Sequence, residues 1–391
     1  MLPSARRSET DMPSTSWRTI PSLDGLRAAS VGLVIVGHYL AYLPGLEGRF
    51  PFAQLSWAGQ SGVDVFFVIS GFLITHILLQ EDKANGSISL RRFYLRRFFR
   101  IFPPFYVYLA TVVVLSVWGF VPQDRRNLIS AATYTWNYMS HVPSWLLAHT
   151  WSLSLEEQFY LAWPPLLVLL GKRKSRYLAV ACIVFSPALR LATYVLAPSL
   201  RGMVPVMLHT RLDTIMFGCA IALFWDEPRF HFAITKLLRA DIVGCSIAYI
   251  LVAPVLSERF QARYDWLIGY PLRGLLISIV MLYVVCKPTS RVGYTLNLAP
   301  VRHLGVISYS LYLWQQMFTA GHSWPFPVLF LALFACAEGS YWLVERPSLR
   351  MRDWIEARVP ALRRRSNVPQ EERPTLRHPK ADENTVLAGD L

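Results

Sequence analysis

One histidine, His38, lies deep inside an apolar stretch and could serve as a base. It follows Arg27 by eleven residues within a predicted membrane helix at 26–43. Eleven helical steps of about 100° amount to about three full turns, so Arg27 and His38 share a helix face, about 16 Å apart. Polar side chains in the bilayer usually face a protein interior or a cavity, which predicts a functional histidine; the alternative is a histidine satisfied by a neighbouring helix.

Arginines gather in a second segment, RRFYLRRFFRIFPP, where Arg92, Arg96, Arg97 and Arg100 fall at helical spacings and form a basic stripe. Such a stripe can bind the phosphates of a ligand. It is equally typical of the positive residues that keep a loop in the cytoplasm. The interleaved aromatic residues favour an interface helix over a nucleic-acid platform, so no nucleic-acid partner is predicted.

Two adjacent carboxylates, Glu156 and Glu157, occur in a third segment, HTWSLSLEEQFYLAWPPLL. The two carboxylates could have a purely structural role, in which they complement the positive end of a helix capped by Ser152 or Ser154. Adjacent residues on a helix project about 100° apart, so we expect at most one of the two to point into a shared cavity. A carboxylate beside His38 would orient the imidazole and stabilise its protonated form, as a general base requires.

The elements that hold these residues are predicted to be membrane helices. Of 391 residues, 53% are hydrophobic and only 16% are charged, which is hard to reconcile with a water-soluble protein. The formal net charge of +14 is concentrated in basic clusters between apolar stretches, a pattern typical of loops that face anionic lipids. The five cysteines occur singly in apolar runs, which predicts buried side chains and no metal site.

Apolar runs of about 20 residues predict an all-α polytopic helical bundle with about ten crossings. The third crossing is expected to begin after Pro103 and Pro104, and another is expected to end at Gly171, where a basic cluster follows. A shorter run at 128–138 predicts a re-entrant or interfacial helix. The third crossing is expected to end near Phe120, and the one that ends at Gly171 is 155–170; the remaining crossings are expected at 26–43, 62–79, 178–196, 212–225, 242–256, 271–286, 304–321 and 328–344.

Three parts follow from this pattern. Residues 1–19 are expected to be a cytoplasmic N-terminal segment without a cleaved signal peptide, and 20–347 to form the membrane domain. Residues 348–391 are expected to be a cytoplasmic and largely disordered tail with a surface helix at 351–359. The basic clusters thus predict a multi-pass protein with both termini in the cytoplasm.

These segments, together with SLDGLRAASVGLVIVGHYL, GVDVFFVISGFLIT, TRLDTIMFGCAIAL, ISYSLYLWQQ and VERP, closely resemble the acyltransferase-3 family of integral-membrane acyltransferases. The resemblance covers 20–347. Its motifs are Arg-x10-His at Arg27 and His38, Arg-x-x-Arg at Arg97 and Arg100, and SLSxEEQFY at 152–160. It implies a bacterial inner-membrane enzyme that O-acylates surface polysaccharides, lipopolysaccharide, peptidoglycan or secondary metabolites, with acyl-coenzyme A as donor and acetyl as the favoured group.

The resemblance also implies roles for single residues. His38 would be the essential catalytic histidine, and Glu156 and Glu157 match the acidic pair of the SLSxEEQFY motif. The chain departs from the family pattern at Gln315, where many relatives have a histidine, so no essential role is expected there. The resemblance does not extend to the esterase-like soluble domain that is fused in some members, so we expect the membrane domain or a separate partner to complete transfer to the acceptor.

The expected mechanism places coenzyme A against Arg27, Arg97 and Arg100 on the cytoplasmic side, with its thioester reaching His38. A carbohydrate or lipid-linked glycan acceptor would enter from the other side, in contact with membrane lipids. His38 would act either as a general base or as a nucleophile that carries the acyl group, and the sequence leaves both open. No permanently bound cofactor is predicted.

Two other classes of protein fit part of the pattern. Buried histidine, glutamate and arginine side chains also suit a proton-coupled transporter or flippase of a glycan or lipid precursor. Inverted repeats with matched broken helices, which are typical of transporters, are not evident in the sequence. The third class is a receptor or assembly subunit with a degenerate site, against which the intact motifs argue.

Overall fold

The chain forms a bundle of helices in a computed structural model that describes residues 21–41, 58–139, 144–319 and 325–359. No β-strand occurs among these residues, which confirms the all-α class. Seven helical segments of this part are long and apolar enough to cross a membrane, while the count of ten or so crossings stays a prediction. The predicted N-terminal segment 1–19, and the tail from residue 360 on, lie outside the described residues.

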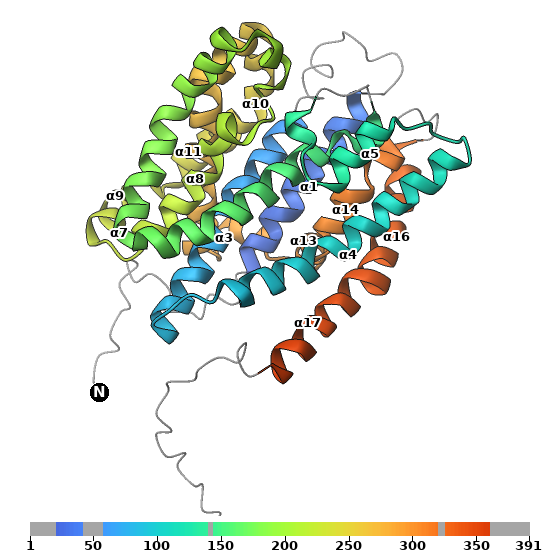
Figure 1. The fold of residues 1–391 in the computed structure, drawn as a ribbon. Helices are drawn as coiled ribbons and strands as arrows, with labels where there is room; N and C mark the ends of the chain where they lie inside the picture. The colour runs from blue at the N-terminus through green and yellow to red at the C-terminus, as the bar shows by residue number, and fades with distance from the viewer. Residues whose placement is uncertain (1–20, 42–57, 140–143, 320–324, 360–391) are drawn as a thin grey trace, which may run out of the picture.

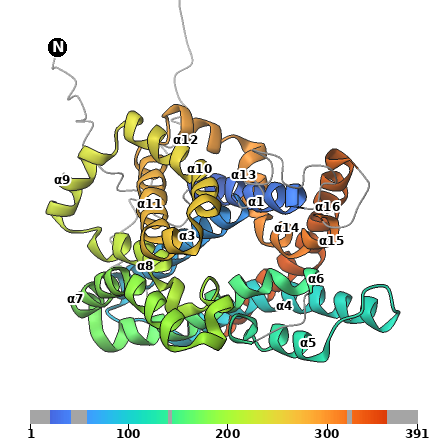
Figure 2. The ribbon, with the colours of Figure 1, turned by 90° about the horizontal axis from the view of Figure 1, so that it is seen from above.

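Helices α1 (Pro21–Ala41) and α3 (Ala58–Asn85) form the centre of the bundle, as the two views in Figures 1 and 2 agree. On one side lie α8 (Leu208–Phe224), α10 (Ala240–Tyr264) and α11 (Tyr270–Cys286). On the other side lie α4 (Leu90–Val117), α5 (Arg125–Ala132), α14 (Ser308–Trp314) and α16 (Phe326–Ser340). The Ser30 hydroxyl of α1 donates a hydrogen bond to the backbone oxygen of Gly62 in α3 at 2.5 Å. Small residues at such crossings let two membrane helices approach closely.

Helix α8 (Leu208–Phe224) packs on α3 with no room for a side chain at Gly218. A Cβ atom added there would overlap the backbone oxygen of Val68 and lie 2.6 Å from the backbone nitrogen of Phe72. The α3–α8 crossing therefore depends on this glycine.

Helix α4 (Leu90–Val117) carries the arginine stripe and continues through Pro103 and Pro104. The crossing predicted to begin after these prolines is part of a longer helix, because one helix includes the arginine segment as well. Prolines inside membrane helices are tolerated since neighbouring groups satisfy the carbonyls that lose their donors. The stripe is thus held rigidly on the same element as the third crossing.

Helix α7 (Thr150–Leu196) is interrupted at Gly171, whose φ of 67° and ψ of 170° are not helical. The interruption confirms the predicted boundary between the crossings 155–170 and 178–196. Just beyond it, Lys172 donates to Asp226 at 2.6 Å, and Lys83 of α3 donates to the same carboxylate at 2.9 Å. Partial burial alone would raise the pKa of Asp226, but the two lysines lower it to about 2, so the carboxylate stays charged and joins the ends of three helices.

The second half of the chain continues with α10 (Ala240–Tyr264), the π-helical turn η3 (Asp265–Gly269) and α11 (Tyr270–Cys286). The predicted crossing at 304–321 is not one helix, because α13 (Ala299–Val306), α14 (Ser308–Trp314) and α15 (Gln316–Thr319) are separate. The chain ends with α16 (Phe326–Ser340), η4 (Tyr341–Glu345) and α17 (Arg346–Arg358), the last of which includes most of the predicted surface helix.

The remaining helices are short. The single helix predicted at 128–138 is in fact α5 followed by a 3-10 turn, η1. The bounds of the short helices are α5 (Arg125–Ala132), η1 (Trp136–Tyr138), α6 (Trp145–Ala148), η2 (Pro198–Met203), α9 (Pro228–Leu237) and α12 (Arg291–Leu296).

Candidate active site

A pocket lies between α1, α3, α4, α7 and α14 and brings together five of the six residues singled out in the sequence. Five apolar and eleven polar residues line it. The polar residues are Arg27, Ser70, Arg97, Arg100, Ser152, Glu156, Glu157, Tyr160, Ser308, Tyr309 and Tyr312. The sixth predicted residue, His38, is not part of this lining.

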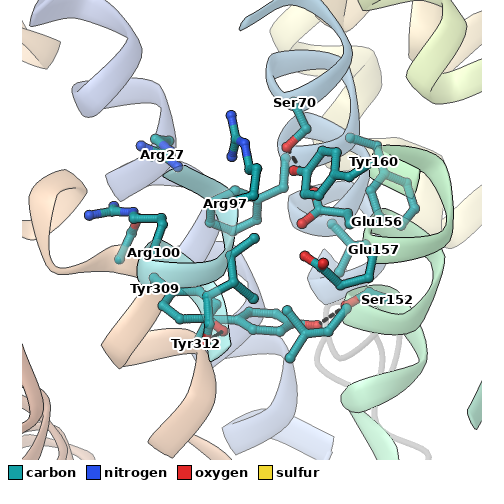
Figure 3. A pocket seen from close by; sticks show the side chains of 16 residues that line it. Arg27, Ser70, Arg97, Arg100, Ser152, Glu156, Glu157, Tyr160, Tyr309 and Tyr312 are labelled. Atoms are coloured by element: carbon teal, nitrogen blue, oxygen red, sulfur yellow. Dashed lines mark hydrogen bonds between the residues drawn. The ribbon is translucent and has the colours of Figure 1, made fainter. Parts of the chain in front are cut away.

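The arginines form one side of the pocket, opposite the glutamates, as Figure 3 shows. Arg100 is bound to the buried carboxylate of Glu345 at 2.5 Å, which neutralises much of its charge. Arg97 lies over the ring of Tyr160, 4.9 Å from its centroid, and has no carboxylate within ion-pair distance among the described residues. Arg27 likewise has no carboxylate partner in the described part of the chain. Two arginines thus offer guanidinium groups to an anion.

Both acidic side chains line the same pocket, so the expectation that at most one could do so was wrong. The reason is that the pocket extends around α7 far enough for two neighbouring residues to reach it. Glu156 accepts a hydrogen bond from the Ser70 hydroxyl of α3 at 2.8 Å. The helix begins at Thr150, so Glu156 and Glu157 lie in its second turn and do not act on its positive end.

The serines considered as caps have other partners. Ser152 shares a hydrogen bond of 2.5 Å with the Tyr312 hydroxyl, and Ser154 donates to the backbone oxygen of Thr150 at 2.8 Å. Ser152 and Tyr312 together line the lower part of the pocket in the view of Figure 3. They therefore belong to the pocket and not to a helix cap.

His38 is held by a residue from the other end of the sequence. Its Nδ1 lies 2.9 Å from the side-chain oxygen Oε1 of Gln315. Its ring packs edge-on against Trp145, with ring centroids 5.1 Å apart. The expectation that a glutamate beside His38 orients the imidazole is not met, because the partner found among the described residues is this glutamine.

A layer of polar contacts connects the pocket with the surroundings of His38. The Tyr312 hydroxyl, at the pocket wall, also donates to the backbone oxygen of His149 at 3.2 Å. The His149 imidazole is bonded through Nδ1 to the Gln316 side chain, and the Trp145 indole donates to the backbone oxygen of Gln316 at 2.8 Å. His38 packs against the same Trp145 and is not part of the pocket lining.

Sequence reasoning missed His149 and Gln316, and it assigned no essential role to Gln315. All three side chains are buried. His149 could have been found from the sequence, because it is the first residue of the segment HTWSLSLEEQFYLAWPPLL that carries the acidic pair. No cluster of three or more histidine, cysteine or acidic side chains with the geometry of a metal site occurs among the residues that the structure describes.

The fold and the pocket together define a multi-pass membrane protein with a buried site in which arginines face carboxylates. The protein family described as "Acyltransferase domain" matches residues 20–344 of the chain. The chain therefore belongs to this acyltransferase family, which confirms the resemblance seen in its motifs. No solved structure matches the chain.

Several curated relatives carry names of O-acetyltransferases. The peptidoglycan O-acetyltransferase OatA of Listeria monocytogenes is 30% identical over 85% of this chain and 56% of its own length. The putative peptidoglycan O-acetyltransferase YrhL of Bacillus subtilis is 32% identical over 76% of this chain and 48% of its own length. O-acetyltransferase OatA of Staphylococcus aureus is 32% identical over 77% of this chain and 50% of its own length. This chain thus spans about half the length of the curated relatives that it matches.

Proposed function

We propose that this chain transfers an acyl group, expected to be acetyl, from acyl-coenzyme A to a hydroxyl group of a cell-envelope glycan. The observation that carries the proposal is the pocket in which Arg27 and Arg97 lack carboxylate partners among the described residues, in a chain of the acyltransferase family. Anionic groups of a donor would complete the coordination of these guanidinium groups. The names of the relatives supply the glycan acceptor and the acetyl group.

The phosphates of coenzyme A would bind on the arginine side of the pocket. The pantetheine arm contains amide N–H groups, which donate hydrogen bonds readily to carboxylates. Glu156 and Glu157 line the opposite side, and neither contacts His38 in the described structure, so a role in holding the donor fits both residues. Ser152 and Tyr312 would then lie beside the acyl end of the donor.

The acyl thioester must still reach His38. His38 does not line the pocket, so Trp145, His149 and Tyr312, which link the two regions, would have to move when the donor extends into the membrane. The donor would enter from the cytoplasm at the Arg27 end of α1, and the acceptor would enter from the other side of the membrane, at the His38 end. Such an arrangement keeps the two substrates on their own sides until the acyl group is transferred.

The reaction that we propose for His38 is general-base catalysis. The imidazole Nε2 takes the proton of the acceptor hydroxyl while the hydroxyl oxygen forms a bond to the thioester carbonyl carbon. The carbon–sulfur bond then breaks, and the leaving thiolate receives the proton from the imidazolium. The products are an O-acyl ester and free coenzyme A, so no other reactant is needed.

Purified protein in lipid vesicles tests the proposal. With labelled acetyl-coenzyme A and a glycan fragment, the protein should release coenzyme A and label the glycan. His38→Ala should lower the rate by about a hundred- to ten-thousandfold, the usual contribution of a general base. Undiminished transfer by His38→Ala would remove His38 from the mechanism. Movement of a glycan across the vesicle membrane without acylation would favour a transporter over an enzyme.

A further inference from the structure

We propose that Gln315 is the residue that positions His38 and selects its reactive nitrogen; this inference rests on the proposed function of His38. The sequence pattern predicts no essential role at position 315, since many members of the family have a histidine there. The structure nevertheless makes Gln315 the hydrogen-bond partner of the His38 imidazole.

The oxygen end of the Gln315 amide faces His38 in the structure. The Gln315 side chain is fully buried, and its oxygen Oε1 lies 2.9 Å from Nδ1 of His38. The Thr319 hydroxyl donates toward the same oxygen at 3.3 Å and toward the backbone oxygen of Gln315 at 3.0 Å. The amide oxygen is the end that the structure turns toward the imidazole, and the amide nitrogen is buried without a hydrogen-bond partner among the described residues.

An amide oxygen can only accept, so the neutral imidazole must carry its proton on Nδ1. The lone pair is then on Nε2, since the hydrogen bond to Gln315 is made at Nδ1. This is the nitrogen that can accept a proton from a hydroxyl. The hydrogen bond and the edge-on contact with Trp145 together hold the ring in one orientation.

An amide also differs from a carboxylate in a way that suits this reaction. It accepts the Nδ1 proton and orients the ring without adding a negative charge, so it favours the imidazolium less than a carboxylate would. The other titratable group near His38 in the described structure is His149, and it is held in the same manner by the adjacent residue, Gln316. The break between α14 and α15 at Gln315 lets two consecutive glutamines each hold one histidine.

Three variants test this proposal in the vesicle assay. Gln315→Met keeps a similar volume but offers no acceptor, so kcat should fall about ten- to a hundredfold. The KM for acetyl-coenzyme A should not change, because Gln315 does not line the donor pocket. Gln315→Glu keeps an acceptor and should recover most of kcat, with the acidic limb of its pH–rate profile moved to higher pH since a carboxylate favours the imidazolium. Gln60→Met serves as control, because Gln60 lies on α3 and its amide nitrogen bonds to no described residue.

Two results would overturn the proposal while leaving the role of His38 intact. The first is a normal kcat for Gln315→Met. The second is an equal loss in Gln315→Met and Gln315→Glu with an unchanged pH profile, which would indicate a purely structural residue. Should Gln315→Met fail to accumulate in the membrane, the pH profile of Gln315→Glu decides alone. Failure of the proposed function itself would be seen separately, as normal activity of His38→Ala.

Discussion

Arg96 and Arg97 are neighbours in the sequence but have different surroundings. Arg96 is bound to Glu356 through two hydrogen bonds of 2.5 and 2.6 Å, outside the pocket. Arg97 lines the pocket and has no such carboxylate partner in the described part of the chain. The sequence treats both as members of one basic stripe, and only the structure separates the arginine that can bind a ligand from the one that ties α4 to α17.

We therefore expect Arg97→Gln to raise the KM for acetyl-coenzyme A about tenfold or more, because a charge-assisted hydrogen bond contributes about 1.5–3 kcal/mol. Arg96→Gln should leave that KM nearly unchanged, although it weakens the contact with Glu356. Initial rates at varied donor concentration measure both. Equal effects of the two substitutions would mean that the arginines act only through their general positive charge.

The residues of the candidate site were predicted from the sequence to different extents. Arg27, Arg97, Glu156 and Glu157 were found by residue type and helical spacing, and the fold places them around one pocket. Gln315 was set aside because its side chain does not match the family pattern, and its contact with His38 joins positions 277 residues apart. Contacts between distant helices depend on packing, which helical periodicity does not reveal.

Among the helices, the crossing of α3 and α8 gives the sharpest mutational test. A Cβ atom at Gly218 would overlap the backbone of α3, whereas one at Gly244 of α10 would meet no atom within 4 Å. Overpacking of this kind destabilises by about 1–3 kcal/mol. Gly218→Ala should thus lower the thermal unfolding temperature in detergent, and Gly244→Ala should not. If both variants unfold at the temperature of the unchanged protein, the two helices are not packed this closely.

The positions of most helices follow from apolar runs, since each crossing needs about 20 apolar residues. The boundary at Gly171 was also predictable, because glycine adopts a positive φ readily and a basic cluster follows it. Sequence-based expectations failed where rules for helices in water do not hold inside a membrane protein. Pro103 and Pro104 normally end a helix in water, but α4 continues through them. The apolar run at 304–321 gives no indication of the break between α14 and α15, which places Gln315 and Gln316 beside two histidines.

For the molecule as a whole, a buried group of charges joins the central helices to the side formed by α8 and α11. Asp64 of α3 is paired with Arg211 and, at 2.9 Å, with Arg273. Arg273 also pairs with Asp265 at 2.8 Å. Asp64, Arg211 and Arg273 are all nearly inaccessible to solvent, so each charge depends on its partners.

Asp64→Asn should destabilise the protein by about 3–5 kcal/mol, because two guanidinium charges would lose a buried partner. Asp241→Asn provides a control, since the Arg239–Asp241 pair is exposed and such pairs contribute less than about 1 kcal/mol. Thermal unfolding of the two purified variants in the same detergent compares them. A similar small shift for both would show that the buried charges do not hold the two sides together.

The claim that this chain acylates envelope glycans with His38 as the base is tested most directly in cells. Mass spectrometry of glycans can be compared between cells with the intact gene, without it, and with His38→Ala. The account predicts O-acylated glycan with the intact gene only, while the His38→Ala protein still accumulates in the membrane. O-acylation that persists at its normal level in His38→Ala cells, and is lost only with the gene, would contradict it.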